Sequence, residues 1–212
     1  SQESLWFMDE LQGTLEYNLP FALRLSGDLD TRALNKSLEK VVERHGALRT
    51  VIRSEAGVPY QGLLPKGQWK LSTEDRSADP SSLTREIRAF VSLPFDLGKD
   101  HMFRAALYHI GEGEHVLAGV FHHIASDAWS QGILVKEFMQ LYSYYTKGKG
   151  TALPPLSLQY TDYALWQREH LEGEVVDGQL SYWEDTLKGL ANLQLPTDRP
   201  RPKVQSISGD TI

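Results

Sequence analysis

The chain contains no cysteine among its 212 residues. This excludes a disulfide framework, a thiolate nucleophile and a thiolate metal site in this chain. The lack of cysteine is also compatible with a reducing compartment, and we expect a cytoplasmic location.

Long apolar runs and basic clusters are missing as well. No apolar segment approaches the ~18 residues that a membrane-spanning helix needs, and the chain opens on polar residues rather than on a basic and apolar signal sequence. The 22 basic residues are outnumbered by 28 acidic ones, which gives a net charge of −6, and the two kinds are interleaved. We therefore expect neither a nucleic-acid partner nor a membrane partner.

The composition that remains is that of a globular protein, with 41% hydrophobic, 24% charged and 10% aromatic residues. At ~100–200 residues per domain, the chain is long enough for one sizeable domain or two small ones with a buried core. It begins with Ser1 rather than Met, which favours a piece of a longer protein.

Helix and strand patterns alternate along the chain. Helical spacing of apolar residues predicts helices over residues 4–11, 31–45, 82–91, 127–145, 161–171 and 178–187. Alternating or β-rich stretches predict strands over residues 19–25, 48–52, 102–110 and 115–121, with a further short strand after a turn at 55–57. This order predicts an α/β sandwich with a mixed sheet, on which helices 31–45 and 127–145 pack. The proline-rich residues 195–202 predict an extended strap.

Residues 121–130, with the sequence FHHIASDAWS, place two histidines at a strand end and an aspartate at a helix start. Side chains alternate along a strand, so His123 shares a face with Phe121 while His122 points the other way. A lone histidine is most often structural, and Asp127 alone would be a helix cap. The adjacent pair followed by Asp127 is an uncommon grouping, which predicts a functional site.

Two other chemistries fit this segment less well. Imidazoles and a carboxylate are metal ligands, but His122 and His123 diverge and no second cluster with HExxH-like spacing exists, so we predict no metal site. A serine hydrolase would use Ser126 or Ser130, but neither lies in a GxSxG elbow.

Two further segments attract attention. Residues 44–50, RHGALRT, put Arg44 and Arg49 where a helix ends and a strand starts. Cations there usually complement the helix dipole, although either arginine can instead pair with a buried aspartate. Residues 160–167, YTDYALWQ, form an aromatic stripe at helical spacing, which we predict to belong to the core.

Together these segments resemble the condensation domain of nonribosomal peptide synthetases. Residues 122–130 are similar to the family's HHxxxDGxS signature, residues 44–50 to its RHxxLRT motif and residues 160–167 to its YxDYAxWQ motif. Residues 4–11 are similar to the end of its AQxxLWxLxxL motif. The resemblance covers nearly the whole chain, but only the first half of the family's domain.

The resemblance therefore implies the N-terminal lobe of a chloramphenicol acetyltransferase-like fold. We expect this lobe to span residues 1–195, with residues 196–212 as a strap leading toward a C-terminal lobe. In the family the reaction takes place between the two lobes, so the isolated half is expected to be inactive or weakly active.

The activity implied is amide formation, in which the amine of an acceptor aminoacyl thioester attacks a donor acyl thioester. The resemblance implies no directly bound cofactor, because both substrates are tethered to the phosphopantetheine of carrier proteins. The partners implied are the donor and acceptor peptidyl carrier protein domains, the C-terminal lobe and an adjacent adenylation domain.

The resemblance also implies roles for the motif residues. His123 would accept the proton of the attacking amine or orient that amine, and His122 would be structural. Asp127 would stay ionised and hold the loop by pairing with Arg44 or Arg49.

The three residues after Asp127 are expected to contact substrate, and they are Ala128, Trp129 and Ser130. The backbone N–H groups of Ala128 and Trp129, at a helix N-terminus, would face the developing oxyanion. Ala128 stands where the family usually has glycine. A positive φ there would make alanine costly, but the first residue of a helix tolerates it.

Three alternatives remain open at this stage. A tailoring or epimerising relative would keep both histidines, whereas heterocyclising relatives replace them by aspartates and fit less well. The chain could also be a non-catalytic module that docks a carrier protein, or a free-standing acyltransferase that uses coenzyme A. A second lobe directly downstream of residue 212 in the parent gene would separate these alternatives best.

Overall fold

The computed structural model describes residues 2–13, 15–148 and 153–200. The chain divides into two compact units, Ser1–Thr161 and Asp162–Ile212. Residues 196–200 of the expected strap contain neither helix nor strand, and the rest of the strap lies outside the described residues. The expected boundary between lobe and strap stays a prediction.

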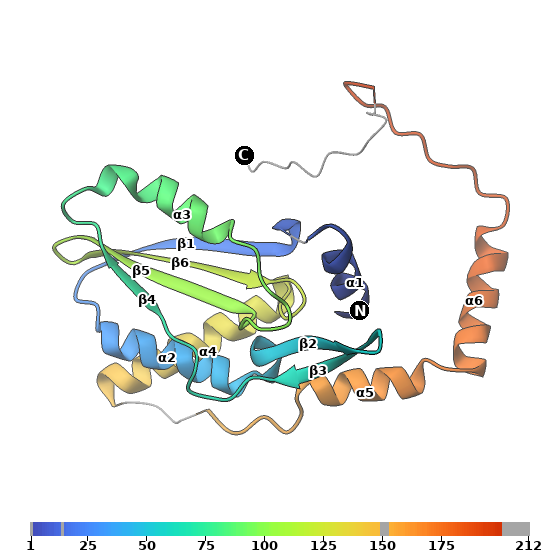
Figure 1. Cartoon of the computed structure of the whole chain (residues 1–212), viewed down its shortest axis with the longest axis horizontal. Coiled ribbons are helices and arrows are strands. Elements are labelled where there is room, and N and C mark those ends of the chain that lie inside the picture. The colour runs from blue at the N-terminus through green and yellow to red at the C-terminus, as the bar shows by residue number, and fades with distance from the viewer. Residues whose placement is uncertain (1, 14, 149–152, 201–212) are drawn as a thin grey trace. The chain divides into compact units, whose positions relative to one another are not determined.

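The first unit is built around a four-stranded sheet in the order β1-β6-β5-β4 (Figure 1). These strands are β1 (Asn18–Ser26), β6 (Glu114–His122), β5 (Phe103–Gly111) and β4 (Ser72–Asp75). β1, β6 and β5 are antiparallel, and β4 runs parallel to β5. The predicted mixed sheet is therefore confirmed, and so is its central hairpin.

Helices cover both faces of this sheet (Figure 1). α2 (Thr31–Arg44) and α4 (Ala128–Lys147) pack on one face, as the sequence predicts, and α3 (Leu83–Val91) packs on the other. α2 begins where the carboxylate of Asp30 accepts the N–H of Ala33 at 2.8 Å. α4 ends at Gly148, which adopts a left-handed conformation with φ 58°.

The remaining elements of this unit lie beside the main sheet. They are α1 (Gln2–Gln12), the hairpin strands β2 (Thr50–Glu55) and β3 (Val58–Leu63), and the short 3-10 segments η1 (Leu15–Tyr17), η2 (Gly46–Arg49) and η3 (Pro80–Ser82). β2 and β3 pair with each other in a sheet of their own. The strand predicted from residue 48 therefore starts later, because residues 46–49 form a 3-10 turn.

The core follows the alternation of side chains along the strands. Leu107 and Phe121 pack on the side of α2 and α4, whereas Tyr108 and Ala118 pack against α3. The aromatic rings of Phe103 and Phe121 stack with centroids 4.2 Å apart. The end of β6, which carries His122, is thus packed between cores on both faces.

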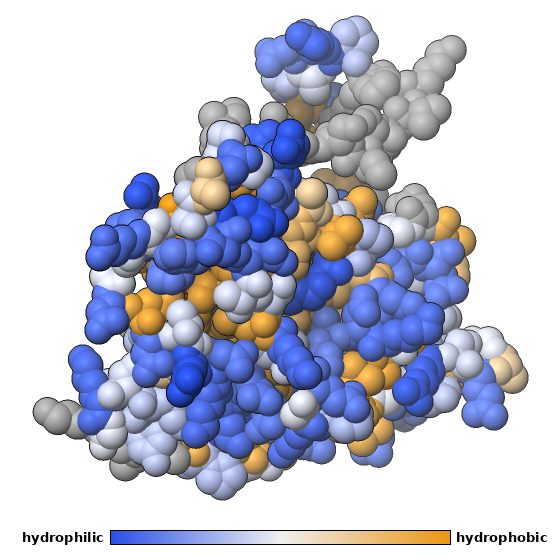
Figure 2. Space-filling view, turned by 60° about the vertical axis from the view of Figure 1, so that its left-hand side comes forward, coloured by the Kyte–Doolittle hydropathy of each residue, from blue (hydrophilic) through white to orange (hydrophobic). Residues whose placement is uncertain are grey.

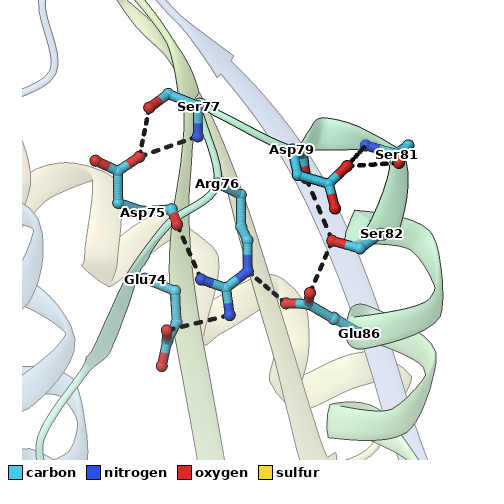
Figure 3. A network of polar contacts seen from close by, with 8 residues as sticks. All are labelled: Glu74, Asp75, Arg76, Ser77, Asp79, Ser81, Ser82 and Glu86. Carbon is cyan, nitrogen blue, oxygen red and sulfur yellow. Dashed lines mark hydrogen bonds and ion pairs between the residues drawn. The ribbon is translucent and has the colours of Figure 1, made fainter.

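β4 was not predicted, because its four residues, STED, have no apolar periodicity. A polar network connects this strand to α3 (Figure 3). Arg76 donates through Nε to Glu86 at 2.7 Å and contacts Glu74 at 3.3 Å, and Ser82 donates to the other oxygen of Glu86 at 2.8 Å. The backbone N–H of Arg76 also bonds to the carbonyl of His109 on β5 at 2.7 Å. Polar contacts rather than apolar burial therefore hold this edge.

Gly119 on β6 has to be a glycine because Phe21 of β1 lies directly across it. A Cβ at Gly119 would overlap the Phe21 ring, which stacks on Phe103 and Phe121. We expect Gly119→Ala to lower the free energy of unfolding by about 1–3 kcal/mol, measured in urea. Gly111→Ala, which meets open space, is the matched control. Equal destabilisation by both variants would contradict this account.

The second unit contains α5 (Tyr160–His170), which starts at the end of the first unit, and α6 (Glu174–Leu187). Neither helix contains a buried residue, and Tyr163 and Trp166 are 45% and 54% exposed. Within this unit, these residues therefore form no core, and the prediction that residues 160–167 belong to one is not confirmed. The helical spacing is confirmed, and it brings aromatic rings together along the helix. The ring centroids of Tyr163 and Trp166 are 5.8 Å apart.

Candidate active site

His122 is the last residue of β6 and is 1% exposed. Its imidazole meets the ring of Phe95 edge-on at 5.5 Å, and its Nδ1 accepts the N–H of Ile124 at 3.2 Å. Burial lowers the pKa of His122 to about 4, against a smaller opposing effect of Asp9. His122 is therefore neutral at neutral pH and sits inside the protein.

His123 follows in a turn and is exposed. Its backbone N–H donates to the carbonyl of Tyr17 at 2.8 Å, which extends the pairing of β1 and β6 by one bond. Its imidazole makes an edge-to-face contact with the Tyr17 ring, with centroids 6.4 Å apart and planes at 70°. The two neighbouring histidines thus differ as the strand alternation predicts, one enclosed and one at the surface.

Asp127 caps α4 through a reciprocal pair of hydrogen bonds. Its Oδ1 accepts the backbone N–H of Ser130 at 2.8 Å, and its own N–H donates to the Ser130 hydroxyl at 2.8 Å. The bonds from the Ser130 N–H and hydroxyl, with a smaller contribution from His123, lower the pKa of Asp127. The capping role of Asp127 is confirmed, and its carboxylate is ionised at neutral pH.

The expected pairing of Asp127 with Arg44 or Arg49 is wrong. Arg44 donates through Nε to both oxygens of Glu137, at 3.1 and 3.0 Å. Arg49 is 8% exposed and donates to the backbone carbonyls of residues 42, 43 and 64. Both arginines thus have other acceptors, and the carboxylate of Asp127 accepts its hydrogen bonds from Ser130 of its own helix.

Glu137 of α4 is one of the residues that hold the RHGALRT segment in place. Besides Arg44, it contacts the Nε2 of His45 at 2.6 Å, and the Arg44 and Glu137 side chains are 12% and 13% exposed. The end of α2 is therefore attached to the middle of α4 through one carboxylate. No motif singled out Glu137, because its partners lie more than 90 residues away in sequence.

Removing Glu137 should therefore destabilise the lobe. We expect Glu137→Ala to lower the free energy of unfolding by about 3 kcal/mol, because it leaves Arg44 without its carboxylate in a mostly buried place. Lys40→Ala is the control, since the Lys40 side chain is 54% exposed in its pair with Glu43 and should contribute less than about 1 kcal/mol. Urea unfolding of both variants measures the difference, and similar values would refute this role.

The start of α4 carries the residues expected to contact substrate. Ala128 is the first residue of the helix, and in the described chain Ala56 is the non-glycine residue with a positive φ. Alanine in place of the family's glycine is therefore unstrained at position 128. Trp129 is 84% exposed, whereas the hydroxyl of Ser130 is engaged in the cap. Their contacts with substrate stay predictions.

Three further features of the described residues concern metal ions and partners. Among the described residues, no group of three or more histidines and carboxylates is arranged to hold a metal ion. In the same part of the chain, no helix combines the length and apolarity needed to cross a membrane. The surface in Figure 2 is mostly hydrophilic, with hydrophobic side chains exposed in several separate places.

The family model described as "Condensation domain" matches residues 1–212. The chain belongs to the condensation domain family. A linear gramicidin synthase of Brevibacillus parabrevis is 42% identical over 218 residues, covering 100% of this chain and 3% of that protein. The dimodular nonribosomal peptide synthase of Bacillus subtilis is 38% identical over 219 residues, which cover 100% of this chain and 9% of that protein. This chain thus spans a small part of the large synthetases that it resembles.

Solved structures share the architecture. The X-domain in its complex with OxyB from teicoplanin biosynthesis superposes with a TM-score of 0.77 at 31% identity, covering 89% of this chain and 42% of that one. The starter condensation domain of rhizomide synthetase RzmA superposes with a TM-score of 0.79 at 16% identity. This match covers 90% of this chain and 47% of that one. The fold is therefore chloramphenicol acetyltransferase-like, and the chain spans about half the length of these structures.

Proposed function

We propose that this chain is the N-terminal half of a peptide-bond-forming condensation domain. In this reaction the amine of an acceptor aminoacyl thioester attacks a donor acyl or peptidyl thioester, and the donor thiol leaves. The observation that carries the proposal is the exposed His123 beside the capped start of α4, at the position of the family's signature. His122 is enclosed in the protein, so His123 is the imidazole of the pair that a substrate can reach.

His123 acts on the attacking amine in this proposal. An α-amine has a reference pKa near ~7.7–8.0, so a usable fraction is uncharged at neutral pH. The remaining requirement is to accept or direct the proton that the nitrogen loses as the amide forms. An exposed imidazole in the turn directly after β6 meets that requirement.

Asp127 supports this chemistry without touching the substrate. Its bonds to Ser130 fix where α4 begins, and this sets the direction of the first backbone N–H groups, those of Ala128 and Trp129. Such groups have no partner within a helix and can stabilise an oxyanion. We assign them this role at the developing tetrahedral centre.

The partners proposed are donor and acceptor carrier protein domains with phosphopantetheine arms, the C-terminal lobe and a neighbouring adenylation domain in a cytoplasmic synthetase. The chain itself binds no cofactor in this scheme. The C-terminal lobe supplies the second wall of the site, so the half-domain alone lacks part of the surface that positions the substrates.

Intact-protein mass spectrometry of loaded carrier proteins tests this function. Donor and acceptor carriers are mixed with this chain alone or with the protein that carries both lobes. We expect transfer of the acyl group to the acceptor amine with both lobes and little or none with the half. Carrier binding without transfer in the two-lobe protein would favour a docking module. Acylation of the acceptor amine by added acyl-coenzyme A in place of the loaded donor carrier, with coenzyme A as the leaving thiol, would favour the other acyltransferase class.

A further inference from the structure

Tyr17 lies against both histidines of the candidate site. It is the last residue of η1, and its ring centroid is 6.4 Å from that of His123 and 6.5 Å from that of His122. Its backbone carbonyl accepts the N–H of His123 at 2.8 Å. Tyr17 therefore contacts His123 through both its main chain and its side chain.

The neighbourhood of Tyr17 is itself firmly held. The next residue, Asn18, pairs with His122 across the two strands. The Asn18 side chain donates to the carbonyls of Val91 and Leu93, at 2.9 and 3.1 Å, where α3 ends. The start of β1 is thus fixed to β6 on one side and to the segment after α3 on the other.

His123, by contrast, needs an external constraint. It lies in an exposed turn beyond the last strand residue, where a side chain ordinarily samples several rotamers. In the described part of the chain, the aromatic neighbour of its imidazole is Tyr17. An edge-to-face contact favours one relative orientation of two rings, so it restricts the imidazole.

We infer that Tyr17 is a positioning residue for His123. The carbonyl of Tyr17 sets the position of the His123 backbone, and its ring sets the direction in which the imidazole meets the acceptor amine. The inference rests on the proposed function, because it concerns the same imidazole and the same reaction. The ring of Tyr17, not its hydroxyl, is the group that acts.

The test compares Tyr17→Leu with Tyr17→Phe in the protein that carries both lobes. Tyr17→Leu keeps the carbonyl and removes the ring, so kcat for condensation should fall by between about ten- and a hundredfold, with KM for the acceptor carrier unchanged. Tyr17→Phe keeps the ring and should retain the wild-type rate. Tyr60→Leu, which removes an exposed tyrosine on β3, is the matched control and should retain it too.

Nuclear magnetic resonance of protein labelled with 13C-histidine follows the ring contact independently of turnover. The signals of His123, assigned by their loss in His123→Asn, should move in Tyr17→Leu and stay in Tyr17→Phe. If Tyr17→Leu lowers the melting temperature, Tyr17→Met repeats the comparison with a flexible side chain that fills the space.

The possible failures can be told apart. No product from the wild-type two-lobe protein would refute the proposed function. Product from the wild type, with an equal rate or unmoved His123 signals in Tyr17→Leu, would overturn the positioning role alone. An equal loss in Tyr17→Phe would overturn it as well, because the hydroxyl would then be the active group.

Discussion

Replacing His123 by alanine in the protein that carries both lobes is expected to lower the condensation rate by about 10²–10⁴-fold, the range for a lost acid–base group. The melting temperature should stay close to that of the wild type, because the His123 side chain is exposed and adds little packing. Mass-spectrometric condensation assays and thermal melts of the same preparations measure the two effects.

Asp127→Ala should behave differently, because it removes a helix cap. We expect a loss of about 0.5–2 kcal/mol in the free energy of unfolding together with lower activity, since the start of α4 loses its two bonds to the Asp127 carboxylate. Asp127→Asn retains an oxygen acceptor and is the control for capping. If Asp127→Ala kept the melting temperature of the wild type while His123→Ala was unfolded, the two roles would be reversed and this assignment of the site would be refuted.

Acidification should destabilise the protein through His122. Its pKa is about 4 in the folded protein, below the 6.5 of an ordinary histidine, so the unfolded chain binds this proton first. The stability that depends on neutral His122 is complete above pH 6.5, falls as the pH drops and is lost by about pH 4. The pKa difference corresponds to about 3 kcal/mol.

Urea unfolding of the wild type and His122→Asn between pH 4 and 7 measures this effect. The asparagine oxygen can replace Nδ1 as acceptor for the Ile124 N–H, but it does not titrate. The variant should therefore be less stable by a roughly constant packing loss, and its stability should depend less on pH. If the free energy of unfolding changed with pH in parallel for the two proteins, His122 would not be the titrating group.

The main helices and the central hairpin could be predicted because each combines a strong apolar period with a clear start or stop. Asp30 precedes α2, Asp127 precedes α4 and Gly148 follows it. β4 could not be predicted in this way, since ion pairs of Arg76 stabilise it instead of an apolar face. For the aromatic stripe of α5, helical spacing predicts the helix but does not say what encloses the rings.

The candidate site was predictable in its order but not in its contacts. The alternation along β6 separates His122 from His123, and the helix start identifies Asp127 as a cap. The partners of Arg44 and the place of Tyr17 depend on how α2 meets α4 and on the register of β1 against β6. Such long-range pairings leave no mark in a local motif.

The exposed indole at the start of α4 offers a point for chemical tethering. Trp129 is 84% exposed, and the 212 residues contain no native thiol. A Trp129→Cys substitution would place the chain's single sulfhydryl next to the candidate reaction centre. A carrier protein bearing a haloacetyl-pantetheine would then attach at one known atom, giving a homogeneous cross-linked complex without prior removal of competing cysteines from this half.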